Sequence, residues 1–542
     1  MQMRKWWLMA LVILMVFLTA CSSNSGNNAE KPSTTGENSG SGNGETSSGD
    51  SGYEEHYVIT AMDFRYGNPA PLDGPGLKAI NEKFNIDYQI TQVVNTAYEE
   101  KLNVTFASGE IPDFLQLMSG DLNNRYKRYA KEGAFLPLDE YIDDYETFRI
   151  VPDFIWDALR IDGKIYGIPS YAPKFQTTTM IRKDWLDNLG LEVPTSYEEL
   201  KEVAIAFTKN DPDGNGVDDT YGIAIGNPLN PSYAMGPWWD PQAWYHQDEN
   251  GNFIPGLIGE GRKEVIQMLA DLYKEGAITS DLAILNWAET NNEFYSGKAG
   301  IFIGTPRGMS QDYVDGLLKI HPEAEFVAVE PFAQPDGHQG FLSGQGFSHI
   351  TVLSAKLADE PGKIKRILDM IDFGRKFHPP ETQNKSNPDF DWYRGGEGVA
   401  YDVVDGKVVM RENWASDGLA PSTYFVDNVE WPPRDSDIVY ADTYQTPQLV
   451  DVVRQYEEMY TRINLYANPI NGLESETQVA KGAELETYVM NEQIKMVMGE
   501  RPVSEWDQLV EEYLSQGGAQ IIEEFNEGIE DKDPQAYWQS PQ

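Results

Sequence analysis

The sequence predicts an α/β protein with two hydrophobic cores and an additional helical C-terminal region, and three observations support this. The chain has 542 residues, and the part after residue 52 is too long for one core, because single cores stop growing at about 250–300 residues. Strand-like and helical stretches alternate at the start of that part. Helical spacing dominates its later half, and 12% of the chain is aromatic, which is enough for two cores.

The alternation begins soon after residue 52. His56 to Phe64 is typical of a buried strand, the segment after Pro71 to Phe84 of a helix, and Ile86 to Val94 of a second strand. Helical spacing returns from Tyr98 to Phe106, and the turn from Ser108 to Asp113 leads into another strand. Because strand, helix and strand of this length form right-handed crossovers, we expect a mainly parallel sheet.

Later stretches of the chain carry apolar residues at helical spacing. The last of them form an acidic pair, and no repeat of solenoid length occurs in the series. The expected helices are Ser196 to Phe207, Gly261 to Glu275, Pro361 to Phe373, Pro447 to Ile463, and a terminal pair within Ser504 to Gly528.

The N-terminus has the pattern of a bacterial lipoprotein signal peptide. Arg4 and Lys5 precede an apolar run from Trp6 to Leu18, and Leu18-Thr19-Ala20-Cys21 ends in the one cysteine of the chain. Small residues before it permit cleavage after residue 20, so that a lipid such as palmitate anchors Cys21 to the outer face of the cell membrane. The alternative is a membrane-spanning anchor with an incidental cysteine, but 13 apolar residues fall short of the roughly 20 that span a bilayer.

The composition predicts a flexible tether and excludes several classes of partner. Ser, Gly, Asn and Thr make up 24 of the 31 residues from Ser22 to Gly52, which is typical of a flexible linker. The net charge of −44 would repel phosphate backbones and therefore argues against nucleic acid as a partner. We expect the lipid anchor alone to contact the membrane. Without a second cysteine, the body of the chain has no disulfide, catalytic thiol or zinc knuckle.

An acidic loop has the oxygen spacing of a calcium site. Side-chain oxygens recur at loop positions 1, 3, 5 and 9, and the glycine at position 6 permits a sharp turn. Position 12, where a Glu usually supplies the last carboxylate ligand, is Gly222. Asp219, helped by Thr220, would have to complete the coordination instead. The alternative is a turn whose side chains cap backbone amides. As a structural calcium site, the loop would use Asp211, Asp213, Asn215, the carbonyl of Val217, and Asp219.

Several short motifs occur in a fixed order along the body of the chain. They are Ala107 to Asp113, Gly163 to Pro169, Arg182 to Gly190 with Val193 to Thr195, Ser296 to Gly300, and Gly395 to Tyr401 with Asp405-Gly406. Each motif alone is weak, but in this order behind a lipoprotein signal they make residues 53–542 resemble the extracellular solute-binding proteins of carbohydrate ABC importers. The chain is similar to the large LplA/LipO and alginate-oligosaccharide-binding types of this family.

The resemblance implies a periplasmic-binding-protein-like fold, in which hinge segments join two α/β lobes around a ligand cleft. In alginate-binding relatives the matching acidic loop holds calcium, although a Glu stands there where this chain has Thr220. The resemblance assigns residues 53–170 and 305–353 to an N-terminal lobe, and residues 171–304 and 354–542 to a C-terminal lobe with a helical tail. It places the crossings between the lobes near residues 169–178, 302–307 and 350–354.

Candidate ligand-binding residues come from one aromatic loop and from the neighbourhood of the crossings. Gly236 to His246 holds three tryptophans at neither helical nor strand spacing, which favours a loop that presents ring faces to sugars. The alternative is a satellite hydrophobic cluster beneath a long loop. An arginine at the cleft could pair with a uronate carboxylate. The candidates are Trp238, Trp239, Trp244 and Tyr245 in the loop, and Tyr171, Lys174, Arg307, Gln345, Trp392 and Arg394 elsewhere.

Taken together, these features predict a membrane-anchored, monomeric receptor that captures an oligosaccharide, uronate-bearing glycans included, and delivers it to an ABC permease. No catalytic residue is predicted, since the six histidines are scattered and no nucleophile elbow, phosphate loop or dinucleotide fingerprint occurs. A surface-tethered glycoside hydrolase or polysaccharide lyase is the alternative, because spacing cannot identify a catalytic pair among 86 acidic residues. A peptide receptor is a third reading, which the motifs disfavour.

Overall fold

The structure is a computed structural model that describes residues 52–118, 122–174, 177–304, 311–434, 437–438 and 440–540. The predicted signal peptide, the lipidated Cys21, the tether up to residue 51 and Arg307 lie outside the described residues. Asp50–Gln542 forms one compact unit. In the part of this unit that the structure describes, no helix combines the length and the apolar character needed to cross a membrane.

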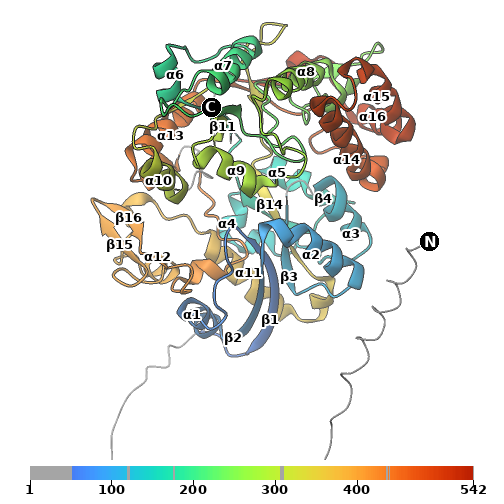
Figure 1. Ribbon diagram of the computed structural model, residues 1–542. Helices are drawn as coiled ribbons and strands as arrows, with labels where there is room; N and C mark the ends of the chain where they lie inside the picture. The colour runs from blue at the N-terminus through green and yellow to red at the C-terminus, as the bar shows by residue number, and fades with distance from the viewer. Residues whose placement is uncertain are drawn as a thin grey trace, which may run out of the picture. The chain divides into compact units, whose positions relative to one another are not determined.

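A five-stranded sheet forms the centre of the first lobe (Figure 1). Its strand order is β2-β1-β3-β14-β6, and β14 alone runs antiparallel to its neighbours. Four of the five strands therefore run in the same direction, as the alternation of strands and helices predicts, although the two pairings made by β14 are antiparallel. Its strands are β1 (Tyr57–Arg65), β2 (Ile86–Val94), β3 (Phe114–Met118), β6 (Gly167–Tyr171) and β14 (Phe347–Leu353).

Helices α1 (Pro75–Phe84) and α2 (Asn95–Ser108) supply the crossovers between β1, β2 and β3. On β2, Ile86, Tyr88 and Ile90 are buried while the intervening side chains are exposed, so one face of the strand packs on the core. The other elements of this lobe are α3 (Lys127–Lys131), α4 (Glu146–Arg149), α5 (Asp153–Ala158), α11 (Pro361–Arg375), α12 (Pro388–Tyr393), β4 (Arg160–Ile161), β5 (Lys164–Ile165), β15 (Tyr401–Val404) and β16 (Lys407–Met410).

A four-stranded sheet forms the centre of the second lobe, with the order β12-β7-β11-β8. Every residue of β7 is buried, since helices cover the sheet. The strands are β7 (Thr178–Arg182), β8 (Tyr221–Ile223), β11 (Ala299–Gly304) and β12 (Phe326–Ala328). The helices that pack into the same core are α6 (Lys183–Leu189), α7 (Tyr197–Lys209), α8 (Glu260–Glu275), α9 (Trp287–Tyr295), α10 (Gln311–Ile320) and α13 (Pro447–Tyr460).

The C-terminal region adds a group of helices to the second core (Figure 1). Its longest helix, α14 (Glu476–Met498), begins at Ser475, whose side chain accepts a hydrogen bond from the backbone N–H of Gln478. It ends at Gly499, which has φ 78° and can adopt this left-handed conformation without a Cβ clash. The region also contains α15 (Trp506–Tyr513), α16 (Ala519–Gly528), β13 (Gly340–Leu342), β17 (Asn464–Tyr466) and β18 (Trp538–Gln539), and the loop nearby carries β9 (His246–Gln247) and β10 (Phe253–Ile254).

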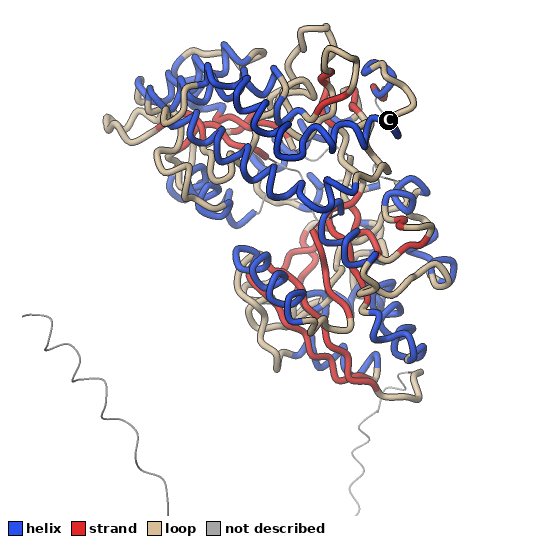
Figure 2. Tube along the Cα trace, turned by 90° about the vertical axis from the view of Figure 1, so that its right-hand side faces the viewer, coloured by secondary structure: helices blue, strands red, loops and turns tan. Residues whose placement is uncertain are grey.

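Along the described residues, the chain passes between the two cores three times. The core changes between Tyr171 and Met180, between Phe341 and Phe347, and between Trp431 and Ala441. Figure 2 shows the two lobes in side view, with the long strands gathered in one and most of the long helices in the other. The first two passages lie at the same end of the strands of the first sheet, because Tyr171 at the end of β6 pairs with Phe347 at the start of β14.

These passages divide the chain differently from the lobe boundaries expected from sequence. Phe302 on β11 and Val314 and Leu317 on α10 all lie in the second core, and β11 and β12 both pair with β7. Ile364 and Val426 lie in the first core, so that core receives a long segment after residue 354. The expected limits, 53–170 with 305–353 and 171–304 with 354–542, stay a prediction as domain boundaries.

Candidate ligand-binding site

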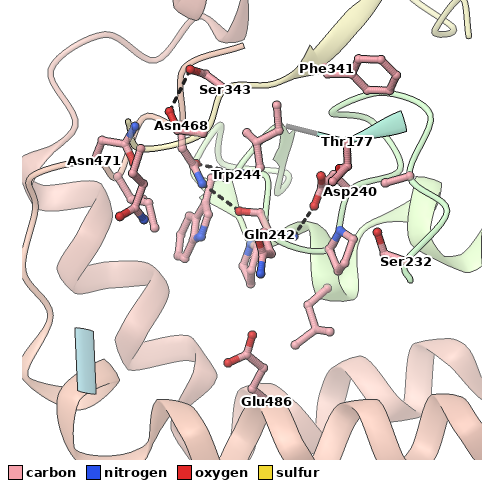
Figure 3. Close-up of a pocket in the computed structure, with 18 of the residues that line it drawn as sticks. Thr177, Ser232, Asp240, Gln242, Trp244, Phe341, Ser343, Asn468, Asn471 and Glu486 are labelled. Atoms are coloured by element: carbon pink, nitrogen blue, oxygen red, sulfur yellow. Dashed lines mark hydrogen bonds between the residues drawn. The ribbon is translucent and has the colours of Figure 1, made fainter. Parts of the chain in front are cut away.

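A cavity of about 510 Å³ lies against the second core and the first two passages. This volume falls in the range of about 300–1,000 Å³ typical of ligand pockets. Its wall combines aromatic side chains with amides and hydroxyls (Figure 3). The segments that build it are Thr177 to Thr179 at the start of β7, the loop from Asp240 to Trp244, the second passage from Phe341 to Phe347, the loop from Asn468 to Asn471, and α14.

Trp244 is the tryptophan of the aromatic loop that lines this cavity. Its ring packs on Phe525 with a centroid distance of 5.0 Å, and only 5% of the residue is exposed. The backbone N–H of Trp244 donates to Oδ1 of Asn468 at 3.1 Å. Nδ2 of Asn468 donates in turn to the carbonyl of Gln242 at 2.8 Å, so one asparagine holds both ends of this part of the loop.

The other three aromatic candidates of the loop lie in packed clusters away from the cavity lining. Nε1 of Trp239 donates to Glu264 at 2.7 Å, and its ring packs edge-on against Tyr197. The hydroxyl of Tyr245 donates to Asp336, and the Trp238 ring lies 4.3 Å from that of His246. Trp239 belongs to the second core, and Tyr245 belongs to a smaller cluster against which Trp238 packs. A role of these three rings in ligand binding stays a prediction.

The remaining candidates are spread over three places. Lys174 and Gln345 line the cavity, because the first two passages bring them there. Tyr171 is buried in the first core, with its ring 5.6 Å from that of Trp431. Trp392 packs among Phe84, Phe373 and Phe425 in the same lobe, and Arg394 pairs with Glu430 at 3.6 Å. None of the latter three candidates lines the described cavity.

Several lining residues carry chemistry that the sequence reasoning missed. Asp240 accepts a hydrogen bond from the backbone N–H of Gln242 at 2.8 Å, and burial raises the pKa of its carboxyl to about 6. Desolvation by the surrounding cavity wall also raises the pKa of Glu486, which lies on α14 with its side chain open to the cavity. The spacing of Leu485, Val489 and Gln493 on the buried face of that helix, behind the cap at residue 475, is the signal that could have revealed it.

Aromatic rings also lie at the end of the first sheet where the first two passages begin or finish. The last residues of β1 and β3 lie at this end too, because His349 pairs with Met118 while Phe347 pairs with Tyr171. The ring of Phe64 stacks on His349 at 4.8 Å and meets Tyr66 at 5.4 Å, and Tyr66 is 69% exposed. Phe347, on the same strand as His349, lines the cavity, whereas Phe64, Tyr66 and His349 do not line it.

The acidic loop brings its predicted oxygen ligands close together. Nδ2 of Asn215 donates to Asp213 at 2.9 Å and to Asp219 at 3.3 Å, and the backbone N–H of Gly216 donates to Asp211 at 3.0 Å. Burial raises the pKa of Asp213, and the nearby carboxylates of Asp211 and Asp219 raise it further.

The loop does not, however, form a finished metal site. Among the described residues, no three or more His, Cys, Asp and Glu side chains are arranged to hold a metal ion. The hydroxyl of Thr220 donates to the carbonyl of Phe207 at 2.9 Å, so it is turned toward α7 and not toward the loop ligands. The oxygen-only donor set still suits a hard cation such as calcium.

Known proteins resemble this chain over nearly its whole length. It is 26% identical over 539 residues to Lipoprotein LipO of Bacillus subtilis (strain 168), which covers 97% of this chain and 98% of the relative. It is 28% identical over 497 residues to the polygalacturonan/rhamnogalacturonan-binding protein YtcQ of the same strain, covering 89% and 93% of the two chains.

The fold also matches solved structures. A crystal structure of the alginate-binding protein AlgQ2 without calcium ion superimposes with a TM-score of 0.64 at 22% identity, covering 88% of this chain and 98% of that one. At this identity the likeness establishes the two-lobe α/β fold and not the ligand. A profile of the bacterial extracellular solute-binding proteins matches residues 77–354. Because this match spans more than half of the chain, the protein belongs to the bacterial extracellular solute-binding protein family.

Proposed function

We propose that this protein is the receptor of an ABC importer, and that it captures an oligosaccharide in the cavity beside Trp244. The observation that carries the proposal is a cavity of about 510 Å³ whose wall is drawn from a two-lobe solute-binding fold and combines an aromatic ring with amides and hydroxyls. Relatives named for polygalacturonan and rhamnogalacturonan, and for alginate, support a carbohydrate as the ligand class.

The chemistry of the lining suits a sugar. Apolar faces of pyranose rings stack on aromatic planes, while the hydroxyl edges need planar polar groups that both donate and accept. Trp244 supplies the plane, and Gln242, Asn468 and Asn471 supply amides around it. Phe64 and Tyr66 add a second aromatic surface from the first lobe, so closure of the lobes would hold the ligand between two sets of rings.

The receptor would work at the outer face of the cell membrane. The lipoprotein signal and the tether support an anchor on Cys21, and one relative is named as a lipoprotein. A monomer that closes on its ligand presents a changed surface to the permease, which is how ligand capture becomes transport.

We also propose that the acidic loop binds a structural calcium ion. Asp211, Asp213 and Asp219 would hold it together with the side-chain oxygen of Asn215 and the carbonyl of Val217. The amide of Asn215 contacts Asp213 and Asp219, so rotation of that amide would direct an oxygen toward them. The ion would tie together the segment between α7 and β8 and supply no catalytic chemistry.

Isothermal titration against a panel of neutral and acidic oligosaccharides tests the receptor assignment. We expect stoichiometric binding of at least one oligosaccharide, and chromatography of the mixture should recover it unchanged. Hydrolysis or elimination of the oligosaccharide would instead support a surface-tethered glycoside hydrolase or lyase. Failure of every panel member to bind would contradict the proposal.

A further inference from the structure

The charges that line the cavity are mostly negative. Among the described lining residues, Asp240 and Glu486 are the acids and Lys174 is the one base. The ammonium of Lys174 lies 5.2 Å from the centre of the Phe154 ring on α5. The cation is therefore engaged by an aromatic face of the first lobe, whereas both carboxylates belong to the second-lobe side of the cavity.

Asp240 has a charged neighbour behind it. Arg262 is fully buried on α8, and its charge lowers the pKa of Asp240 against the larger effect of burial. The guanidinium itself donates to Gln493 at 3.0 Å and to the carbonyl of Ser232 at 3.4 Å. Because Arg262 does not line the cavity, it moderates the charge of Asp240 but offers no donor to a ligand.

Glu486 has no such compensation. In the part of the chain that the structure describes, no side chain or backbone N–H hydrogen-bonds or ion-pairs with its carboxylate. The residue is exposed to the cavity, and Figure 3 shows it rising from its helix toward the loop that carries Gln242 and Trp244. Its carboxylate can therefore accept hydrogen bonds from whatever fills the space, and it can donate none while ionised.

We propose that this cavity selects oligosaccharides that carry no carboxylate, and that Glu486 excludes uronates. The proposal rests on the function proposed above and names the ligand class of that site. A neutral sugar offers hydroxyl donors to Glu486 and Asp240. A uronate replaces one hydroxymethyl donor by an acceptor-only carboxylate, which would share a protein-lined space with two negative groups. The selectivity would thus differ from that named for YtcQ.

Titration of galacturonate oligomers and their fully methyl-esterified forms, beside neutral oligosaccharides of the same length, tests the selectivity. We expect the tightest ligand of the panel to be neutral, and any bound galacturonate oligomer to be at least about tenfold weaker than its methyl ester at low salt. A galacturonate oligomer that binds as tightly as its ester, or better than every neutral sugar, overturns the proposal while the receptor function stands. If no member of the panel binds, both the selectivity proposal and the receptor proposal are contradicted.

The variant Glu486→Gln tests the role of the residue, and Glu484→Gln is the matched control. Both lie on exposed positions of α14, but Glu484 does not line the cavity. We expect E486Q to tighten the binding of galacturonate oligomers relative to their esters by about tenfold, and E484Q to leave the ratio unchanged. An unchanged ratio in E486Q, including continued failure to bind the acid, overturns the assignment of Glu486. A neutral ligand that E486Q still binds shows that the variant is folded.

Discussion

Tyr66 offers a test of the first-lobe wall that is separate from folding. Its side chain is 69% exposed at the sheet edge beside Phe64, so removing it should leave the melting temperature unchanged. We expect Tyr66→Ala to weaken oligosaccharide binding by about 1 kcal/mol, in line with other aromatic contacts. Tyr313→Ala is the control, because Tyr313 is 54% exposed on α10. Equal affinities of both variants in calorimetry would remove Tyr66 from the site.

Arg375 and Asp427 form an ion pair that is entirely buried in the first lobe, at 3.3 Å. Arg375→Gln removes the cation of this pair and leaves the Asp427 carboxylate buried without that charge beside it, so it should lower the free energy of unfolding by about 3–5 kcal/mol. Arg411→Gln breaks a pair with Asp402 in which both side chains are more than 40% exposed, and exposed pairs contribute about 0–1 kcal/mol. Urea denaturation measures both, and similar losses would contradict this distinction.

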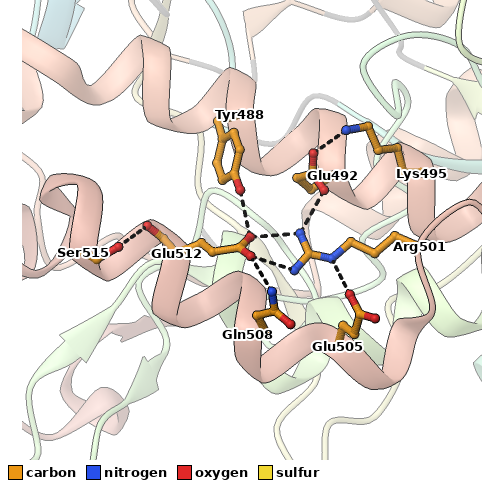
Figure 4. A network of polar contacts seen from close by, with 8 residues as sticks. All are labelled: Tyr488, Glu492, Lys495, Arg501, Glu505, Gln508, Glu512 and Ser515. Carbon is orange, nitrogen blue, oxygen red and sulfur yellow. Dashed lines mark hydrogen bonds and ion pairs between the residues drawn. The ribbon is translucent and has the colours of Figure 1, made fainter.

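At the scale of elements, α14 and α15 are tied together by Arg501 (Figure 4). Its guanidinium contacts Glu492 at 2.8 Å and Glu512 at 2.9 Å. Hydrogen bonding from Arg501, followed by that from Tyr488, lowers the pKa of Glu512 from 4.5 to about 2. A carboxyl with a lowered pKa stabilises the fold above its ordinary pKa, and this contribution disappears as the pH falls toward 2.

The matched pair Glu512→Gln and Glu511→Gln tests this contribution. We expect E512Q to be less stable than the wild type at pH 7, and the difference to shrink as the pH falls from about 4.5 to about 2. Glu511 is exposed, and the hydrogen bonds from Arg501 and Tyr488 go to Glu512, so E511Q should follow the wild type at every pH. Urea denaturation across this range is the measurement, and a difference independent of pH would contradict the role of the Glu512 charge.

The acidic loop is a second element whose contribution depends on solution conditions. Calcium that binds the folded chain stabilises it by mass action, by about 2.7 kcal/mol at one hundred times the dissociation constant. Chelation should therefore lower the melting temperature, and added calcium should restore it. The combined Asp211→Asn and Asp219→Asn substitutions should abolish the response, whereas Asp218→Asn, at a position outside the ligand spacing, should preserve it. If calcium does not change the melting temperature of the wild type, the loop is a turn and not a calcium site.

At the scale of the whole molecule, the receptor proposal predicts a change of shape. An oligosaccharide that contacts both lobes favours the closed arrangement, since it binds that arrangement more tightly. Small-angle scattering should therefore show a smaller radius of gyration with the bound oligosaccharide than without it. A sugar of the same length that fails to bind serves as the control. An unchanged radius at saturation would contradict closure.

Many elements of the fold follow from local sequence. The strand at Ile86 to Val94 and the helices near Pro361 and Pro447 form where the spacing predicts, because each buries one regular face. Helix α14 escaped prediction, although its buried face recurs at Leu485, Val489 and Gln493. Polar residues surround that face, and its burial depends on packing against α8 and α16.

The sequence by itself determined the family, the α/β class and the oxygen chemistry of the acidic loop, because short motifs and local spacing encode them. The tertiary structure decided the site. Trp244 lines the cavity while Trp238 and Trp239 pack in clusters, and nothing in their spacing distinguishes them. Glu486 and Asp240 line one cavity although they lie 246 positions apart in the sequence. Which residues line the same cavity depends on where distant segments of the chain pack, and local residue preferences do not specify this.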